Sequence, residues 1–121
     1  MTAAVRVWPI RLSAAAEVDF QGILRWTLEQ FGEVQAQVYA DTLSTALESL
    51  AAGPKVIGAK ARNDIAKGLF TLHVARHGRK GRHFIIFRIG RDKDRDVIEV
   101  LRLLHDAMDV ARHLSPTDEP K

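Results

Sequence analysis

The sequence of 121 residues contains no cysteine. This absence excludes disulfide bonds, catalysis by a thiolate and zinc sites that depend on cysteine ligands. Long apolar runs are also missing: the longest, Phe84–Phe87, has four residues, whereas a membrane-spanning helix needs ~18. Pro9 and Arg11 interrupt anything that resembles the apolar core of a signal peptide. We therefore expect a soluble, cytoplasmic protein with no membrane partner.

Basic residues are scarce at both ends of the chain and concentrated in its middle. The overall composition is that of one ordinary globular domain, with 46% apolar and 27% charged residues. Residues 1–54 and 96–121 each hold three Lys/Arg and six Asp/Glu, whereas residues 55–95 hold twelve and three, a net charge of +9. This asymmetry indicates a surface for an acidic partner, either a nucleic acid or an acidic protein. A solvated face rich in Lys and Arg is the other interpretation.

The N-terminal half has the pattern of a helix hairpin. Apolar residues recur at steps of three and four on both sides of Gly32, which is typical of two amphipathic helices. Ser13 is a good N-cap for the first helix, and Gly32 supplies its left-handed C-cap. The second helix starts at about Glu33 and ends at Gly53. Because the break is so short, the two helices must fold back as an antiparallel pair.

Four further segments have the composition of β-strands. Val5–Arg11 contains a proline, which cannot donate to a ladder, so we predict an edge strand there. Leu69–Arg76, His83–Gly90 and Val97–His105 are joined by short charged turns, which indicates an antiparallel meander. The last two strands are apolar on both faces, so something besides the helices must cover part of the sheet. Lys55–Gly68 has no clear period and is predicted to be a loop.

The order of elements predicts an α+β fold. The hairpin packs on one face of a small antiparallel sheet, in the order β-α-α-β-β-β, after an N-terminal edge strand. Ala107–Leu114 is predicted to form a short C-terminal helix. Residues 1–114 then make a single domain, and residues 115–121, with two prolines, form a disordered tail.

Several short segments along the chain form a recognisable pattern through their order and spacing. They are Asp19-Phe20, Phe31-Gly32, Gly68-Leu69, Arg76-His77 and His83–Arg88, followed by a C-terminal signature of Arg102, His105, Met108 and Asp109. Together these residues resemble the RelE/ParE toxins of bacterial type II toxin–antitoxin systems, with the ParE branch fitting best. The resemblance covers residues 5–114, which is nearly the whole chain.

The resemblance implies a toxin that a cognate antitoxin wraps and silences, so we expect a hetero-oligomer with that antitoxin. ParE-like members bind DNA gyrase and poison it without chemistry of their own, and the resemblance makes gyrase the expected target here. RelE-like members instead cut mRNA in the ribosome. A ribosome-dependent endoribonuclease is therefore the alternative, and a non-toxic remnant that still binds the antitoxin is a further one.

The enzymatic alternative requires a base, an acid and cations on the phosphate. His105 is the candidate acid or base because histidine titrates near neutral pH, and its position is similar to that of a catalytic residue in some RelE-like relatives. The candidate cations are Arg76, Arg82 and Arg88. Tyr39 is the single tyrosine, and the helical stripe that contains it predicts that it lies in the core. The set of residues needed for RNA cleavage is therefore incomplete, and we expect that the protein is not an enzyme. The histidine spacing forms no recognisable metal site, and no cofactor is expected.

Two surfaces are predicted to bind partners. The target is expected to meet a basic patch made of Arg76, His77, Arg79, Lys80 and Arg82. The antitoxin is expected to become ordered on binding, as a helix over the hairpin and a strand along one sheet edge. Its candidate contacts are Trp8, Trp26 and Val38, although core packing is the competing interpretation for both tryptophans.

Overall fold

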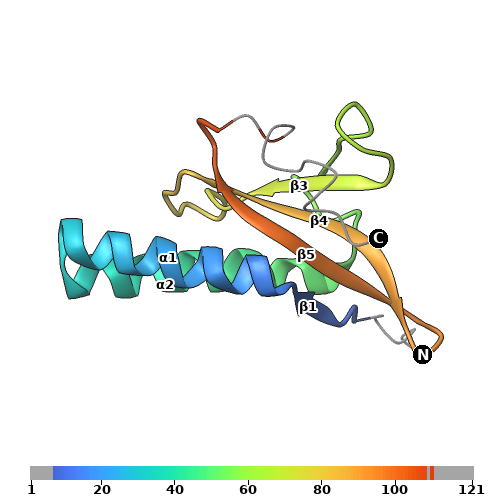
Figure 1. Cartoon of the computed structure of the whole chain (residues 1–121), viewed down its shortest axis with the longest axis horizontal. Helices are drawn as coiled ribbons and strands as arrows, with labels where there is room; N and C mark the ends of the chain where they lie inside the picture. The colour runs from blue at the N-terminus through green and yellow to red at the C-terminus, as the bar shows by residue number, and fades with distance from the viewer. Residues whose placement is uncertain (1–6, 109, 111–121) are drawn as a thin grey trace.

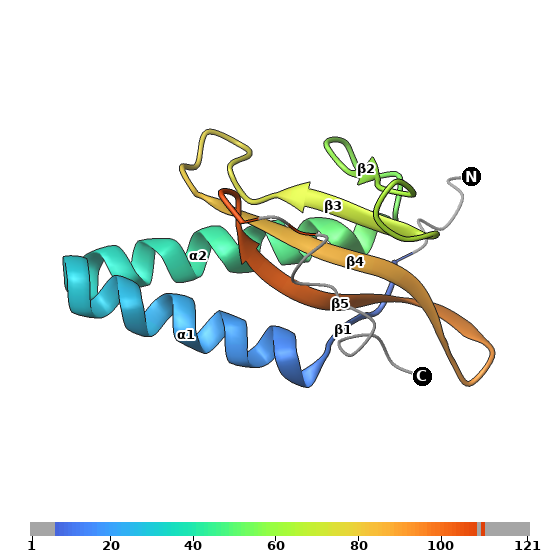
Figure 2. The same ribbon diagram turned by 45° about the horizontal axis from the view of Figure 1, so that its top comes forward.

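The computed structural model describes residues 7–108 and 110. In chain order the elements are β1 (Ile10–Leu12), α1 (Ala14–Phe31), α2 (Glu33–Ser49), the short helix η1 (Leu50–Ala52), β2 (Lys60–Ala61), β3 (Leu69–His73), β4 (His83–Asp92) and β5 (Arg95–His105). The two long helices lie side by side against one face of a curved sheet (Figures 1 and 2). This arrangement confirms the predicted α+β fold.

Helix α1 begins and ends where the sequence predicts, whereas α2 ends at Ser49 and the short helix η1 continues to Ala52, just before Gly53. The Oγ of Ser13 accepts a hydrogen bond from the backbone N–H of Ala16 at 3.0 Å, which caps the start of α1. Gly32 adopts a φ of +91°, a left-handed conformation that favours glycine, and its N–H donates to the carbonyl of Leu28. Because this one residue both ends α1 and precedes α2, the hairpin has a tight tip. That tip extends beyond the sheet (Figure 1).

The sheet has five strands in the order β1-β5-β4-β3-β2. Strands β2 to β5 pair antiparallel, as the predicted meander requires, whereas β1 joins β5 in parallel, with Ile10 opposite Ile98. The sheet is therefore mixed rather than wholly antiparallel. The N-terminal strand lies at an edge as predicted, and Val5 and Arg6 lie outside the described residues. Among the described residues the strand spans Ile10–Leu12, so Pro9 lies before it instead of inside it.

The start of α1 covers the edge of β5 beyond the end of β1. The Oγ of Ser13 donates to the carbonyl of Leu101, and the carboxylate of Asp19 accepts from the N–H of Leu103. The same carboxylate accepts two hydrogen bonds from the guanidinium of Arg102, at 2.7 and 3.1 Å. These side-chain contacts fix α1 to the sheet where backbone pairing stops.

A β-bulge in β5 decides which side chains face the helices. Phe87 lies opposite Val100, but Ile86 lies opposite Arg102, so Leu101 is the extra residue. Before the bulge Ile98 and Val100 face the helices, and after it Leu103 does, with all three in the core beside Leu43 and Phe87. The change of parity also turns His105 towards the helices.

The opposite face of the sheet carries a second, smaller core. Leu69, Ile86 and Leu104 are buried there, and Ile65, Ala66 and Val110 pack beside them. This confirms that something other than the hairpin covers the second face. Part of this cover is the segment between β2 and β3, which contains Ile65 and Ala66.

Lys55–Gly68, predicted as a loop, contains the two-residue strand β2, which pairs with β3 through Lys60 and Ala61. A strand this short leaves no period that a sequence could reveal. Most of the predicted helix Ala107–Leu114, and the whole of the predicted tail at 115–121, lie outside the described residues. No helix within the described part of the chain is long and apolar enough to cross a membrane.

Candidate functional site

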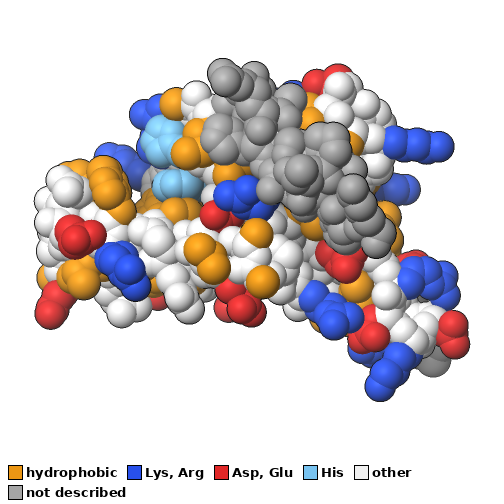
Figure 3. All heavy atoms as spheres, in the orientation of Figure 1, with side chains coloured by type: hydrophobic (Ala, Val, Ile, Leu, Met, Phe, Trp, Pro, Cys, Tyr) orange, Lys and Arg blue, Asp and Glu red, His pale blue; other side chains and the backbone are white. Residues whose placement is uncertain are grey.

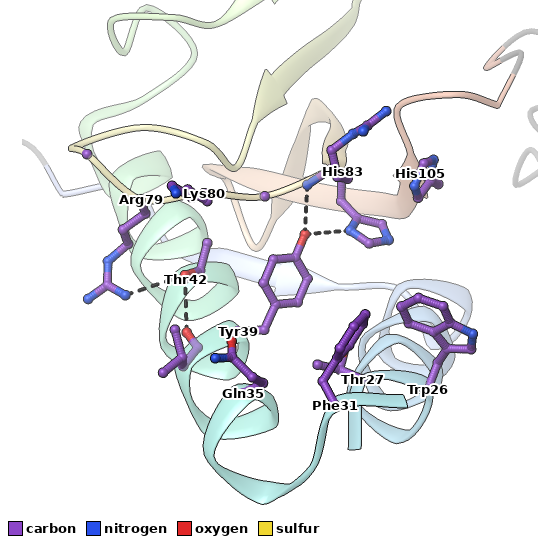
Figure 4. Close-up of a pocket in the computed structure, with 14 residues that line it drawn as sticks. Trp26, Thr27, Phe31, Gln35, Tyr39, Thr42, Arg79, Lys80, His83 and His105 are labelled. Atoms are coloured by element: carbon purple, nitrogen blue, oxygen red, sulfur yellow. Dashed lines mark hydrogen bonds between the residues drawn. The ribbon is translucent and has the colours of Figure 1, made fainter. Parts of the chain in front are cut away.

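A pocket of about 740 Å³ opens between the tip of the hairpin and the end of the sheet. Its third wall comes from the segment between β3 and β4. We call residues 76–82 of this segment the basic turn. Figure 4 shows the lining side chains converging from these three elements. They are Trp26, Thr27, Phe31, Gln35, Val38, Tyr39 and Thr42 from the helices, residues 78–82 from the basic turn, and His83 and His105 from the strands.

The helix wall of the pocket is apolar and open to solvent. Trp26 and Phe31 form an edge-to-face pair with ring centroids 5.7 Å apart, although 56% of Trp26 and 63% of Phe31 are exposed. Val38 is also about half exposed. Figure 3 shows apolar side chains gathered at this free end of the hairpin, next to the histidines. Exposed aromatic residues beside a hollow are typical of a surface that buries a partner's side chain.

The hydroxyl of Tyr39 connects the hairpin to the basic turn. It accepts a hydrogen bond from the backbone N–H of Arg82 at 3.0 Å, and it lies 2.6 Å from Nδ1 of His83. Which of the two groups donates in this second hydrogen bond depends on the tautomer of His83. Burial, with the nearby His105, lowers the pKa of His83 to about 4, and burial also raises the pKa of Tyr39. Both groups are neutral at pH 7.

Asp106 joins the same end of the basic turn to the sheet. Its carboxylate accepts from Nε of Arg82 at 3.0 Å and lies 3.0 Å from Nε2 of His73. The hydrogen bond from Arg82, followed by that from His73, lowers the pKa of Asp106 to about 2. His105 lies beside this pair, with its Nδ1 3.7 Å from Asp106 and its ring 5.3 Å from that of His83.

The predicted basic patch is only partly a free surface. Arg82 is held by Asp106, and Arg76 donates to the carbonyl of Ile57 at 2.7 Å. His77 is exposed and adopts a left-handed conformation, with a φ of +55°. Arg79 and Lys80 are exposed on the rim of the pocket, and neither forms an ion pair with a described carboxylate. The cations available to a partner at this site are therefore chiefly Arg79 and Lys80.

The structure separates the residues predicted for the enzymatic alternative. His105 and Arg82 line the pocket, but Arg76 contacts the loop before β2 and Arg88 pairs across the sheet with Glu99 at 3.0 Å. Tyr39 was predicted to lie in the core. Its ring does pack there, whereas its hydroxyl belongs to the pocket wall.

Trp26 and Val38 lie together on the pocket, but Trp8 lies elsewhere. The backbone N–H of Trp8 donates to the carbonyl of Ala51, at the far end of α2 from the hairpin tip. Its ring packs against the core and against Gly53. The three candidate antitoxin contacts thus do not form one surface. Of the signature residues, Arg102 anchors α1, His105 lines the pocket, Met108 is exposed and Asp109 lies outside the described residues.

Several pocket residues were not predicted as site residues from the sequence. Phe31, Thr42 and His83 all line the pocket. His83 lies on the same face of β4 as the core residues Ile85 and Phe87, because side chains two residues apart on a strand point the same way. Its direction towards the helices follows from this alternation. The involvement of Phe31 follows from its place at the hairpin tip, where α1 has passed the edge of the sheet.

Comparison with known proteins places this fold in a family. A family model described as the ParE toxin of type II toxin–antitoxin systems matches residues 10–110, a range that contains both helices, all five strands and the whole pocket. The chain is 31% identical over 103 residues to a Toxin ParE1 of Mycobacterium tuberculosis, covering 85% of this chain and 94% of that protein. It is 27% identical over 106 residues to a Toxin ParE1 of Caulobacter vibrioides, covering 88% and 97%.

Proposed function

Since the chain belongs to the ParE toxin family of type II toxin–antitoxin systems, we propose that it inhibits DNA gyrase and that a cognate antitoxin neutralises it. The observation that carries this proposal is the family match over residues 10–110. The function is exerted by binding in the cytoplasm, without a cofactor.

The pocket supports a binding role over a catalytic one. The Tyr39 hydroxyl is hydrogen-bonded to His83 and to the backbone of Arg82, and the guanidinium of Arg82 is paired with Asp106. A general base needs a group that is poised to exchange its proton near neutral pH, and a pKa near 4 makes His83 a weak base. We therefore propose that the protein is not an enzyme.

One observation favours the alternative of mRNA cleavage. His105 is partly exposed on the pocket wall, in the same hollow as the cations Lys80 and Arg82. A histidine beside cations can act on a phosphodiester if a second acid–base group is available. The ring of His83 lies 5.3 Å from that of His105, but it is hydrogen-bonded to Tyr39.

The two functions are separated by a pair of assays on one antitoxin-free sample. The first measures DNA supercoiling by gyrase together with trapped cleavage complexes, and the second measures mRNA cleavage in a programmed translation reaction. We expect inhibition of gyrase with intact mRNA. Ribosome-dependent cleavage with normal supercoiling would establish the alternative, and no effect in either assay would leave a remnant that only binds the antitoxin.

The exposed cations of the basic turn are proposed to engage the target. Changing Arg79 and Lys80 together to serine should weaken gyrase inhibition about fivefold and reduce its dependence on salt, because each exposed charge contributes only a fraction of a kcal/mol. Arg82 is left unchanged because its guanidinium holds Asp106. The matched control changes Lys55 and Lys67, which are exposed cations outside the pocket. Equal potency of both double variants would refute this role.

The antitoxin is proposed to dock on the apolar wall of the pocket. Trp26→Glu should weaken the antitoxin complex at least about 30-fold, because aromatic residues at an interface centre commonly contribute 2 kcal/mol or more. Val18→Glu is the control, since Val18 is 69% exposed on the same helix but does not line the pocket. Both variants should unfold at the wild-type urea concentration. An unchanged dissociation constant for Trp26→Glu would contradict the assignment.

A further inference from the structure

We propose that Tyr39 is a positioning residue whose hydroxyl fixes the basic turn against α2 and so sets the place of the rim cations towards an acidic partner. This inference rests on the proposed function, because it concerns how the same pocket engages its target. It assigns a role to a side chain that the sequence alone places in the core.

Several hydrogen bonds of the turn meet at Arg82, its last residue. Arg82 donates its backbone N–H to Tyr39 and its side chain to Asp106, while its carbonyl accepts from the N–H of Asp106 at 2.8 Å. Arg79, near the middle of the turn, reaches the hydroxyl of Thr42 only at 3.4 Å. The hydroxyl of Tyr39 is therefore the strong hydrogen-bond contact between the turn and the helix hairpin among the described residues.

The backbone of the basic turn also packs closely against Tyr39 at Gly81. A Cβ added at Gly81 would lie 2.5 Å from Cγ2 of Val74 and 3.1 Å from the hydroxyl of Tyr39. The backbone of the turn thus passes directly over the tyrosine, with no space for a methyl group. Figure 4 shows the tyrosine ring rising from α2 to meet this backbone, between the rim cations and the two histidines.

The position of the turn controls the shape and charge of the pocket. Arg79 and Lys80 lie three and two residues before Arg82, so any shift of the turn moves both cations relative to the apolar wall of Trp26 and Phe31. A partner that inserts an apolar side chain and pairs an acidic group needs both features in one arrangement. Removing the hydroxyl of Tyr39 should loosen that arrangement while the ring keeps its core contacts.

The test compares Tyr39→Phe with Ser49→Ala, which removes a hydroxyl from the same helix at its far end. Hydrogen exchange of the Arg82 amide should become about tenfold faster in Tyr39→Phe, and gyrase inhibition about tenfold weaker, as expected for one lost hydrogen bond. Ser49→Ala should change neither quantity. A merely structural role would lower the urea midpoint of Tyr39→Phe but leave the potency of the folded protein unchanged, and that result would overturn the inference.

A second variant reaches the turn without altering Tyr39. Gly81→Ala should displace the turn and weaken inhibition to a similar extent, because the added methyl group cannot fit beside Val74. Wild-type potency in Gly81→Ala would also overturn the inference. The exchange measurement requires no target, so it decides the positioning role even if the wild-type chain leaves gyrase unaffected, in which case the proposed target fails separately.

Discussion

The carboxylate of Asp19 should be one of the strongest single contributions to the stability of this fold. It lies on α1 and accepts three hydrogen bonds from β5: two from the guanidinium of Arg102 and one from the backbone N–H of Leu103. The ion pair is largely buried, with 14% of the Asp19 side chain and 21% of the Arg102 side chain exposed. Asp19→Ala removes all three acceptor contacts at once.

The size of the effect follows from what the substitution leaves behind. Breaking a fully buried ion pair by removing one partner costs about 3–5 kcal/mol. The residual exposure of Arg102 lets water replace part of the lost interaction, so we expect about 2–4 kcal/mol for Asp19→Ala. That is a large fraction of the roughly 5–15 kcal/mol by which a domain is stable.

The measurement is urea unfolding followed by tryptophan fluorescence and circular dichroism. Arg102→Met and the double variant complete a cycle, in which the two losses should overlap by about 1 kcal/mol or more. Asp92→Ala serves as a comparison, because its ion pair with Arg11 is 3.4 Å long and exposed, and should cost less than about 1 kcal/mol. Similar losses for the buried and the exposed pair, or no coupling in the cycle, would refute the reasoning.

Two further predictions concern pH and backbone conformation. The pKa of His83 is lowered to about 4 from 6.5, so the unfolded chain binds the proton first and stability should fall between pH 6.5 and pH 4, by up to about 3 kcal/mol. Urea midpoints across this range should show the slope, and His83→Gln should flatten it. Gly53→Ala should cost more than Gly32→Ala, because both have a φ near +90° but only the added Cβ at Gly53 would meet the Trp8 ring, 2.6 Å from its Nε1. Equal thermal shifts for the two alanine variants would contradict the second prediction.

The helix hairpin could be predicted because its signals are local. Ser13 and Gly32 mark the ends of α1 by side-chain capping and by a left-handed backbone, and neither effect depends on the rest of the fold. The strands β3 to β5 were also found, since alternation and charged turns define them. The bounds of strand β1 were not predicted correctly, because its partner β5 lies more than 80 residues later in the chain. The pairing with β5 sets the register of β1, and no local signal reveals it.

The candidate site was harder to predict because it depends on a bulge. Strict alternation along β5 from Ile98 would direct Leu104, not His105, towards the helices. The extra residue at Leu101 reverses this parity, so His105 reaches the pocket opposite His83. The role of Tyr39 was also hard to predict. The helical stripe correctly places its ring against the core, but it does not indicate which groups the hydroxyl contacts.

The charge of the middle segment was counted correctly, but its distribution could not be predicted from the sequence. Arg82 and Arg88 are neutralised by Asp106 and Glu99, which lie outside the +9 segment. Arg79 and Lys80 stay exposed beside an apolar wall. Exposed charges are screened by salt and mainly affect the rate and specificity of association, whereas buried aromatic contacts supply most of the affinity. Loss of the Trp26 ring should therefore weaken the antitoxin complex more than loss of both rim cations, and the reverse order would mean that charge dominates this surface.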